Sequence, residues 1–197
     1  MILSNVEIVK CLKNGDFFIE DLEQITDPEK APFNTSAIDL RLGNEIIIPK
    51  AEEMPVLIDL SSGKSITKLL SASSEKITIS RSQPLILKKN QFILASTRER
   101  VSFPINTGKG KKCFSARVEG KSSIARCGII IHLTAPTIHS NFYGTITLEL
   151  INLSNNHFAL FPDMYICQLI IEEVKGCPLI APNQFIGQTS PIGVIEK

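Results

Sequence analysis

Residues 117–152 read RVEGKSSIARCGIIIHLTAPTIHSNFYGTITLELIN, and this segment gives the clearest indication of the fold class and of the chemistry. It places a polar turn between two glycines, Gly120 and Gly128, with β-type segments on both sides. The segment 144–153 alternates apolar and polar residues and carries one acid, Glu149. Such alternation is typical of a strand that buries one face and exposes the other.

The turn at 120–128 brings hydroxyl and cationic side chains together. Backbone N–H groups and Lys or Arg charges that converge on a tight turn can hold phosphates. A carboxylate fixed on a nearby strand, here Glu149, is a candidate general base. The residues therefore indicate an enzyme that acts on a phosphorylated small molecule. Taken alone, Glu149 fits a solvent-washed polar strand face equally well.

The residues on both sides of this segment predict a mainly β protein. Short apolar segments separated by Gly, Pro and Asn are typical of a β-sandwich, jelly roll or barrel. A short helix is predicted over residues 4–14, between Ser4 or Asn5 as a cap and Gly15 as a stop. The predicted strands are 38–42, 45–48, 76–79, 85–87, 92–96, 113–118, 129–134, 144–153 and 165–172.

The 197 residues suit one domain with appendages. We expect a β domain over residues 1–176 and a C-terminal arm over residues 177–197, in which proline and glycine interrupt the strand pattern. The segment 51–76, rich in Ser, Lys and Glu, is expected to be a surface excursion.

Composition weakens several function classes. The 21 Lys and Arg nearly balance the 20 Asp and Glu, so no basic field indicates a nucleic-acid binder. The basic run at 109–112 is most simply a solvated loop. No signal peptide is apparent, and no apolar run approaches the roughly 18 residues that cross a bilayer, so we expect a cytoplasmic protein without membrane contact. Five scattered cysteines without a C-x-x-C pair are expected to be buried free thiols.

Two nucleotide-enzyme motifs are absent from the sequence. The segment 120–122 looks like the end of a P-loop, but Ser115 occupies the place of the required earlier glycine, and a strand-like segment follows. Zinc-dependent deaminases carry H-x-E and P-C-x-x-C, and neither pattern occurs. We therefore assign no metal ligands and expect no zinc.

Six segments together resemble the dCTP deaminases, a family of the dUTPase-like superfamily of trimeric β-proteins. Residues 120–128 match G-R-S-S-x-A-R-x-G, with Lys121 in place of the first Arg, and residues 142–152 follow F-x-G-x-I-T-L-E-L-x-N. The other four segments are 36–43 (S-x-D-L-R-L-G), 91–99 (F-x-L-A-x-T-x-E), 132–135 (H-V-T-A) and 162–169 (P-G-M-x-I-G-Q-L). One such motif would be weak, but six in the family's order are specific.

The resemblance implies a dUTPase-like distorted jelly roll that forms a homotrimer with active sites at subunit interfaces. It implies zinc-independent hydrolytic deamination of dCTP to dUTP and ammonia, with Mg²⁺ on the triphosphate of the substrate. Glu149 would take a proton from the water that attacks C4 and deliver protons to N3 and the departing ammonia. Ser122 and Arg126 would orient the water and the charge at C4, and the backbone near Ala135 would complete this set.

The resemblance also implies a set of substrate-binding residues. Lys121 and Ser123 would help to hold the phosphates, and the backbone of Thr147 and Leu148 would read the base edge and the sugar. The remaining members of this set are Ile124, Ala125, His139, Gln184 and Gln188. The last two lie in a segment similar to the family's closing tail, so the arm is expected to close over the active site.

One departure from the family pattern bears on the product. His139 stands where the family usually has an Asp, which dUTPases use to activate water. A histidine is not permanently anionic at neutral pH, which argues against dUTP hydrolysis. The alternatives left open are a dUTP diphosphatase, a bifunctional deaminase and diphosphatase, and an inactive nucleotide-binding homologue.

Overall fold

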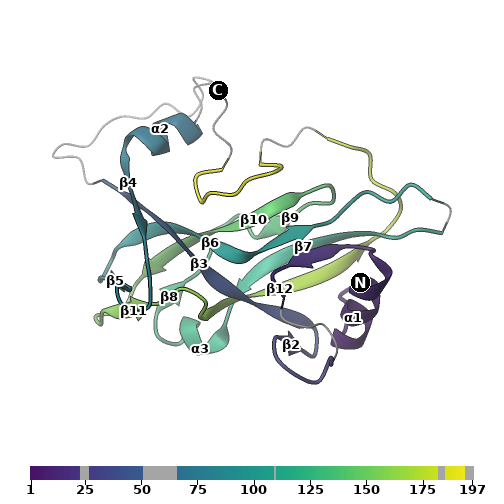
Figure 1. Ribbon diagram of the computed structural model, residues 1–197, viewed down its shortest axis with the longest axis horizontal. Helices are drawn as coiled ribbons and strands as arrows, with labels where there is room; N and C mark the ends of the chain where they lie inside the picture. Colours follow the sequence, from purple (N-terminus) through teal and green to yellow (C-terminus); the bar gives the residue numbers. More distant parts are fainter. Residues whose placement is uncertain (23–26, 51–65, 109, 182–184, 194–197) are drawn as a thin grey trace.

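A computed structural model describes residues 1–22, 27–50, 66–108, 110–181 and 185–193. Strands dominate this part of the chain, and short helices lie at its periphery (Figure 1). The elements are α1 (Asn5–Asn14), β1 (Phe18–Glu20), β2 (Phe33–Asn34), β3 (Ala37–Pro49), α2 (Ile66–Ala72), β4 (Ser74–Thr78), β5 (Leu85–Leu87), β6 (Phe92–Ser102), β7 (Cys113–Gly120), α3 (Ser122–Ala125), β8 (Ile129–Ile130), β9 (Thr137–Ile138), β10 (Tyr143–Asn152), β11 (Phe158–Leu160) and β12 (Tyr165–Val174).

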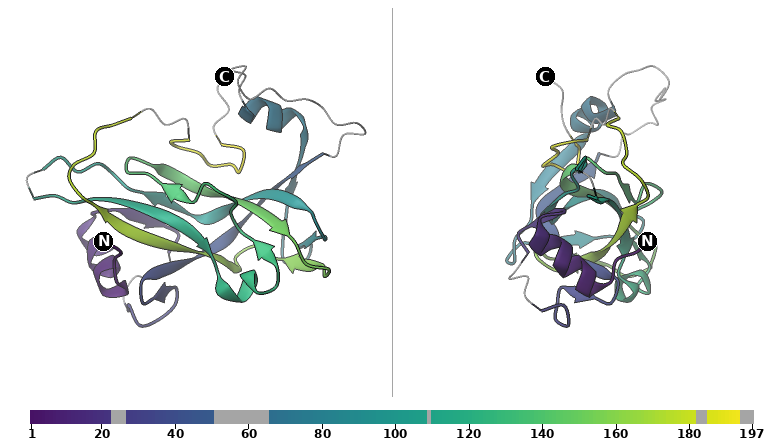
Figure 2. Two further views of the ribbon diagram at one scale, coloured as in Figure 1. Left: turned by 180° about the vertical axis from the view of Figure 1, so that it is seen from behind. Right: turned by 90° about the vertical axis from the view of Figure 1, so that its right-hand side faces the viewer.

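Ten strands form one curled antiparallel sheet. Its main path runs β8-β10-β6-β3-β12-β7-β9, while β1 adds to β6 and both β2 and β4 add to β3. The strands β5 and β11 form a separate pair. Seen end-on, the strands curl around a common interior (Figure 2, right). The apolar side chains of all the long strands can therefore share one core.

The long strand β3 links the two halves of this curled sheet. Its first half pairs with β12, and its second half pairs with β6 and β4. The register with β6 shifts between Leu42 and Ile46, where the strand bends. Gly43 lies at this bend, and a Cβ there would come within 3.0 Å of the Ser96 carbonyl oxygen. The absence of a side chain thus lets β3 pass close to β6.

The core is apolar and continuous. Strand residues at alternate positions are fully buried, among them Leu148 and Leu150 of β10 and Leu169 and Ile171 of β12. Each such side chain stabilises the fold by about 1.5–3 kcal/mol through burial. The helix α1 packs Ile8 against this core at one end of the molecule.

The structure confirms the mainly β prediction and the N-terminal helix. The Ser4 hydroxyl accepts a hydrogen bond from the Glu7 N–H at 3.3 Å, and Gly15 ends α1 with a φ of 70°. Such caps satisfy backbone groups that the helix itself leaves unpaired. No helix of the described residues is long and apolar enough to cross a membrane.

Several strand boundaries differ from the prediction. The segments 38–42 and 45–48 are one strand, β3, and the predicted 92–96 extends to Ser102 as β6. The predicted 129–134 is wrong beyond Ile130, because the chain there turns away from β10. The unpredicted strands are short, two or three residues each, which leaves little room for a periodic pattern: β1, β2, β9 and β11.

The cysteines differ from the prediction, and two predicted surface segments are only partly described. All five cysteines are free, but Cys127 and Cys177 are exposed, so the prediction of buried thiols holds only for Cys11, Cys113 and Cys167. Much of the predicted excursion, as well as Lys109 of the basic run, lies outside the described residues.

Candidate active site

The candidate general base, Glu149, stands on β10 with its neighbours turned into the core. Leu148 and Leu150 are fully buried, whereas Glu149 is half-buried on the opposite face. Its Oε2 accepts a hydrogen bond from the backbone N–H of Leu133 at 2.9 Å. The predicted alternation along this strand is therefore correct. The hydrogen bond to Leu133 was not predicted, because it joins residues 16 positions apart.

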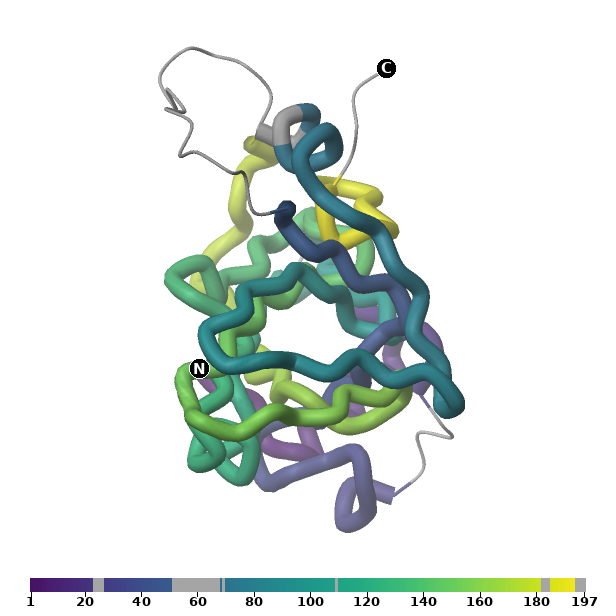
Figure 3. The backbone as a smooth tube through the Cα atoms, turned by 90° about the vertical axis from the view of Figure 1, so that its left-hand side faces the viewer, coloured from purple at the N-terminus to yellow at the C-terminus, as the bar shows by residue number. Residues whose placement is uncertain are grey.

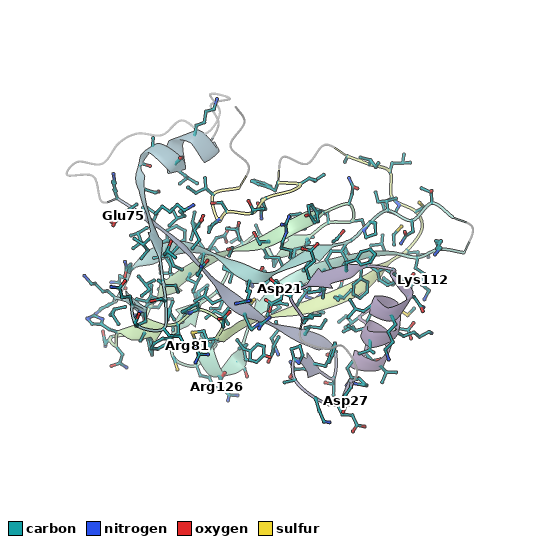
Figure 4. All side chains as sticks on the ribbon, viewed as in Figure 1. Asp21, Asp27, Glu75, Arg81, Lys112 and Arg126 are labelled. Carbon is teal, nitrogen blue, oxygen red and sulfur yellow. The ribbon has the colours of Figure 1, made fainter. Side chains whose placement is uncertain are left out.

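The polar turn that precedes β8 is a single helical turn, α3, on the outside of the sheet. Ser122, Ser123, Ala125 and Arg126 are exposed, and Ile124 packs partly against the core. Among the described residues no partner holds the Arg126 guanidinium, and Figure 4 shows Arg126 beside α3 at the lower edge of the molecule. The turn thus presents two hydroxyls and one guanidinium to solvent.

Lys121, at the N-terminal end of α3, is held by the sheet. Its ammonium forms an ion pair with Asp39 of β3 and lies 5.8 Å from the centre of the Tyr165 ring. Asp39 also accepts hydrogen bonds from Asn34 at 2.8 Å and Gln168 at 3.1 Å. These donors fix the carboxylate, and the carboxylate fixes the ammonium.

Sequence reasoning missed this role of Asp39. The residue lies in the segment 36–43, which contributed to the family resemblance, but no role was assigned to it. The local signal was a single acid between the apolar residues Ile38 and Leu40. Its partner, Lys121, lies 82 positions away in the sequence.

The segment between β8 and β9 lies beside Glu149. Leu133 reaches the Glu149 carboxylate, and Ala135 follows two residues later with an exposed position. His139, just after β9, is exposed, and its carbonyl oxygen accepts a hydrogen bond from the Phe142 N–H at 3.2 Å. The exposed His139 side chain is therefore available to a ligand.

Residues 185–193 of the arm are docked on β10. The Gln188 amide donates to the Thr145 carbonyl oxygen at 2.7 Å and to the Thr147 hydroxyl at 3.3 Å. The Thr147 hydroxyl in turn donates to the Pro191 carbonyl oxygen at 3.2 Å. Figure 3 shows this segment, in yellow, beside the end of β3. A hydrogen bond of 2.5 Å from Ser190 to Glu45 joins the two there.

The structure thus divides the predicted residues into two groups along β10. Glu149 lies two residues from Ile151, which pairs with β8, and β8 follows α3 directly in the chain. Thr147 and the docked Gln188 lie nearer the N-terminal end of β10. The Cα atoms of Thr145 and Glu149, four residues apart on an extended strand, are separated by roughly 13 Å. No hydrogen bond or ion pair joins Glu149 to α3 within the described part of the chain.

For two of the predicted substrate-binding residues, Leu148 and Gln184, the structure describes no side chain at the site. The Leu148 side chain is fully buried and its backbone pairs with Ala95 of β6, so only its backbone edge is within reach of a ligand. Gln184 lies outside the described residues. Among the residues that the structure describes, no three or more His, Cys, Asp or Glu side chains lie close enough together to hold a metal ion.

Known proteins share both the sequence pattern and the fold. The family model described as dCTP deaminase-like matches residues 2–174. A "dCTP deaminase, dUMP-forming" of Dictyoglomus thermophilum is 38% identical over 169 residues, covering 86% of this chain and 78% of the relative. A "dCTP deaminase" of Haloarcula marismortui is 34% identical over 197 residues, covering 97% and 92%.

A solved structure supports the fold assignment. The crystal structure of 2'-deoxycytidine 5'-triphosphate deaminase from Agrobacterium tumefaciens matches with a TM-score of 0.63 at 17% identity over 88% of this chain. This chain spans about half the length of that structure, since the match covers 48% of it. At this identity the likeness concerns the fold alone. The family model and the two relatives, by contrast, extend over most of the sequence, and the chain therefore belongs to the dCTP deaminase-like family.

Proposed function

We propose that this protein is a dCTP deaminase, which replaces the exocyclic amino group of the cytosine with oxygen and releases ammonia. The observation that carries the proposal is the Glu149 carboxylate, which is fixed on β10 by the Leu133 N–H at 2.9 Å. Relatives named dCTP deaminase, 34–38% identical over most of the chain, support dCTP as the substrate. The substrate form would be the Mg²⁺ complex of dCTP.

The hydrogen bond to Leu133 assigns different tasks to the two oxygens of Glu149. Oε2 accepts from the backbone, and among the described residues no donor is recorded for Oε1. Oε1 would therefore take a proton from the attacking water. Water oxygen bonds to C4, the proton passes to N3, and a second proton from the same water leaves with the amino group as ammonia. The carboxylate ends the cycle ionised, as it began.

The exposed turn at α3 would hold the other reacting groups. Ser122 and Arg126 would orient the water and stabilise the charge that develops at C4, while Ser123 and the backbone of Ile124 and Ala125 would bind the substrate. Lys121 is already paired with Asp39, so its ammonium would reach a phosphate from a fixed position. The backbone near Ala135 would read the base.

We further propose that the site is completed by assembly into a homotrimer. Within one chain, no hydrogen bond or ion pair joins Glu149 to α3 among the described residues, and most of α3 is exposed to solvent. A neighbouring copy could bring the two groups together. Light scattering on the purified protein would then give a mass of three times 21.7 kDa, whereas a monomer with full activity would contradict this arrangement.

The arm is proposed to close over the same site. The docking of Gln188 on Thr147 places arm residues along the strand that carries Glu149. The backbone of Thr147 and Leu148 would contact the base and sugar from beneath the arm, and His139 would approach the sugar. Gln184 is proposed to contribute with Gln188. The chain would thus consist of a β domain over residues 1–176 and an arm over residues 177–197.

A second candidate function is a bifunctional enzyme that converts dCTP to dUMP. The observation that favours it is that the relative from Dictyoglomus thermophilum is named dUMP-forming. The observation against it is His139, which cannot act as a permanently anionic base at neutral pH. The two functions differ in two products, because the bifunctional enzyme forms dUMP in place of dUTP and also releases pyrophosphate.

One assay separates these functions. The purified protein is incubated with dCTP and Mg²⁺, and nucleotides, ammonia and pyrophosphate are quantified. We expect dUTP and ammonia, and we expect Glu149→Gln to abolish both while Glu75→Gln, an exposed acid on β4, leaves them unchanged. The appearance of dUMP and pyrophosphate would establish the bifunctional enzyme. Intact dCTP that nonetheless binds would indicate an inactive nucleotide-binding homologue.

A further inference from the structure

Two cysteines meet where the arm leaves the sheet. Cys113 is the first residue of β7, and it pairs in register with Val174, the last residue of β12. The chain then turns at Gly176, whose φ is 88°, a conformation that suits glycine. This turn carries Cys177 back toward Cys113.

The two sulfur atoms share one acceptor. The Cys113 Sγ lies 3.7 Å and the Cys177 Sγ 3.9 Å from the carbonyl oxygen of Asn106. Asn106 is itself held by its side-chain amide, which donates to the Lys112 carbonyl oxygen at 3.1 Å. The thiols are thus brought together by a fixed loop.

The pair is asymmetric in its access to solvent. The Cys113 side chain is 1% exposed, whereas Cys177 is exposed. A small oxidant can therefore reach the Cys177 thiol, whereas the Cys113 thiol is shielded from solvent. This is the arrangement in which an exposed cysteine reacts first and a buried neighbour resolves the product.

We propose that Cys113 and Cys177 form a reversible disulfide that fixes the base of the arm to β7 in the presence of a small-molecule disulfide such as oxidised glutathione. The Cys177 thiolate attacks one sulfur of glutathione disulfide, forms a mixed disulfide and releases one glutathione thiolate. The Cys113 thiolate then attacks the Cys177 sulfur and releases the second glutathione. Two protein thiols are oxidised, one external disulfide is reduced, and both thiol protons leave to solvent.

The bridge would lie away from the proposed active site. Figure 4 labels Lys112, the neighbour of Cys113, at the right-hand end of the molecule near α1, and Arg126 beside α3 at the lower left. The inference therefore does not depend on dCTP being the substrate. Disulfides in reducing compartments are usually transient and redox-sensing, which fits a bridge with one exposed sulfur.

The reaction is expected to be faster at alkaline pH. Partial desolvation of the sulfur, followed by the neighbouring Cys113, raises the pKa of the exposed Cys177 thiol above its ordinary value. Because the thiolate is the nucleophile, the fraction of reactive Cys177 increases as the pH rises toward that pKa. The rate of bridge formation should therefore rise between pH 7 and pH 9.

Peptide mapping under non-reducing conditions tests the proposal. The full-length protein is incubated with oxidised glutathione, alkylated, and separated on a non-reducing gel, and the monomer band is digested with trypsin. Cleavage after Lys112, Arg117 and Lys175 releases the peptides 113–117 and 176–197. We expect these two peptides joined, two hydrogens lighter than their sum, and released by reductant.

Two exposed-cysteine variants serve as the test and its control. Cys177→Ser should abolish the linked pair and leave Cys113 unmodified in the folded protein, because Cys113 is buried. Cys127→Ser removes the other exposed thiol and should leave the linked pair intact. The proposal is overturned if glutathione remains on Cys177 with Cys113 reduced. It is equally overturned if the linked peptides occur only in a dimer band.

Discussion

Substituting Gly144 by alanine should release the arm from β10. A Cβ at Gly144 would lie 2.5 Å from the Gln188 carbonyl oxygen and 3.1 Å from the Gln188 nitrogen. Both contacts are with backbone, so the arm cannot avoid them by turning a side chain. The φ of Gly144, 144°, is also one that residues with a Cβ rarely adopt. The docked arm and an alanine at this position are therefore incompatible.

The size of the effect follows from the hydrogen bonds that the displaced arm loses. The Thr145 N–H donates to the Gln188 carbonyl oxygen at 3.0 Å, and the Gly187 N–H donates to the Tyr143 carbonyl oxygen at 2.6 Å. The Gln188 amide adds a third bond, to the Thr145 carbonyl oxygen. At about 1 kcal/mol net for each bond, docking weakens by about 3 kcal/mol, or roughly 100-fold in population.

Amide hydrogen exchange measures this loss residue by residue. In Gly144→Ala, the amides of Thr145 and Gly187 should exchange roughly 100-fold faster than in the wild type. The neighbouring Ile146 amide donates to the Thr97 hydroxyl at 3.0 Å and should keep its protection. These amides thus distinguish release of the arm from general loosening of β10.

A second variant controls for backbone strain. Gly110 also has a positive φ, 77°, but no atom of the described residues lies within 4 Å of a Cβ placed there. Gly110→Ala should therefore leave the exchange of Thr145 unchanged. If the Thr145 amide exchanges at the wild-type rate in Gly144→Ala, the arm tolerates the added Cβ, and the predicted displacement of the arm is wrong. If the arm closes over the proposed site, kcat/KM for dCTP should fall in Gly144→Ala as well.

Three further predictions concern stability and binding. Glu99, buried, accepts from the Arg41 backbone and side chain at 2.8 and 2.6 Å; Glu99→Gln should lower the free energy of unfolding by about 3–5 kcal/mol in urea denaturation. Burial raises the pKa of Cys11 from 9.0 to about 11; the unfolded state then loses this proton first, so unfolding titrations should show stability declining between those pH values, and Cys11→Ala should show a smaller decline, because burial also raises the pKa of Cys167. Asp39→Asn should release Lys121 and raise KM for dCTP roughly tenfold, with kcat little changed in steady-state assays; an unaltered KM would exclude Lys121 from substrate binding.

Local sequence patterns predicted the elements that are long enough to show a period. The helix over residues 4–14 and the strand 144–153 were placed within one residue, because several turns or alternations reinforce each other there. The buried and exposed faces of β10 followed from the same alternation. The two-residue strands β2 and β9 and the three-residue strands β1 and β11 contain no such repetition and were not predicted.

The sequence proposed which residues belong to the candidate site, but it did not predict which of them contact one another. The family motifs named Glu149, the α3 turn and Gln188. The hydrogen bond from Leu133 to Glu149 depends on how the chain turns after β8, where the sequence alone favoured a longer strand. The resemblance also assigned Lys121 to phosphate, whereas the folded chain pairs it with Asp39.

The class of fold, the family and the chemical groups available for the reaction could therefore be read from the sequence, because they depend on local periodicity and on motifs of contiguous residues. Which of these groups touch became clear only in the folded chain. The pairing of Asp39 with Lys121 and the meeting of Cys113 with Cys177 join residues more than 60 positions apart. Such contacts are set by the curl and register of the whole sheet, which no single segment encodes.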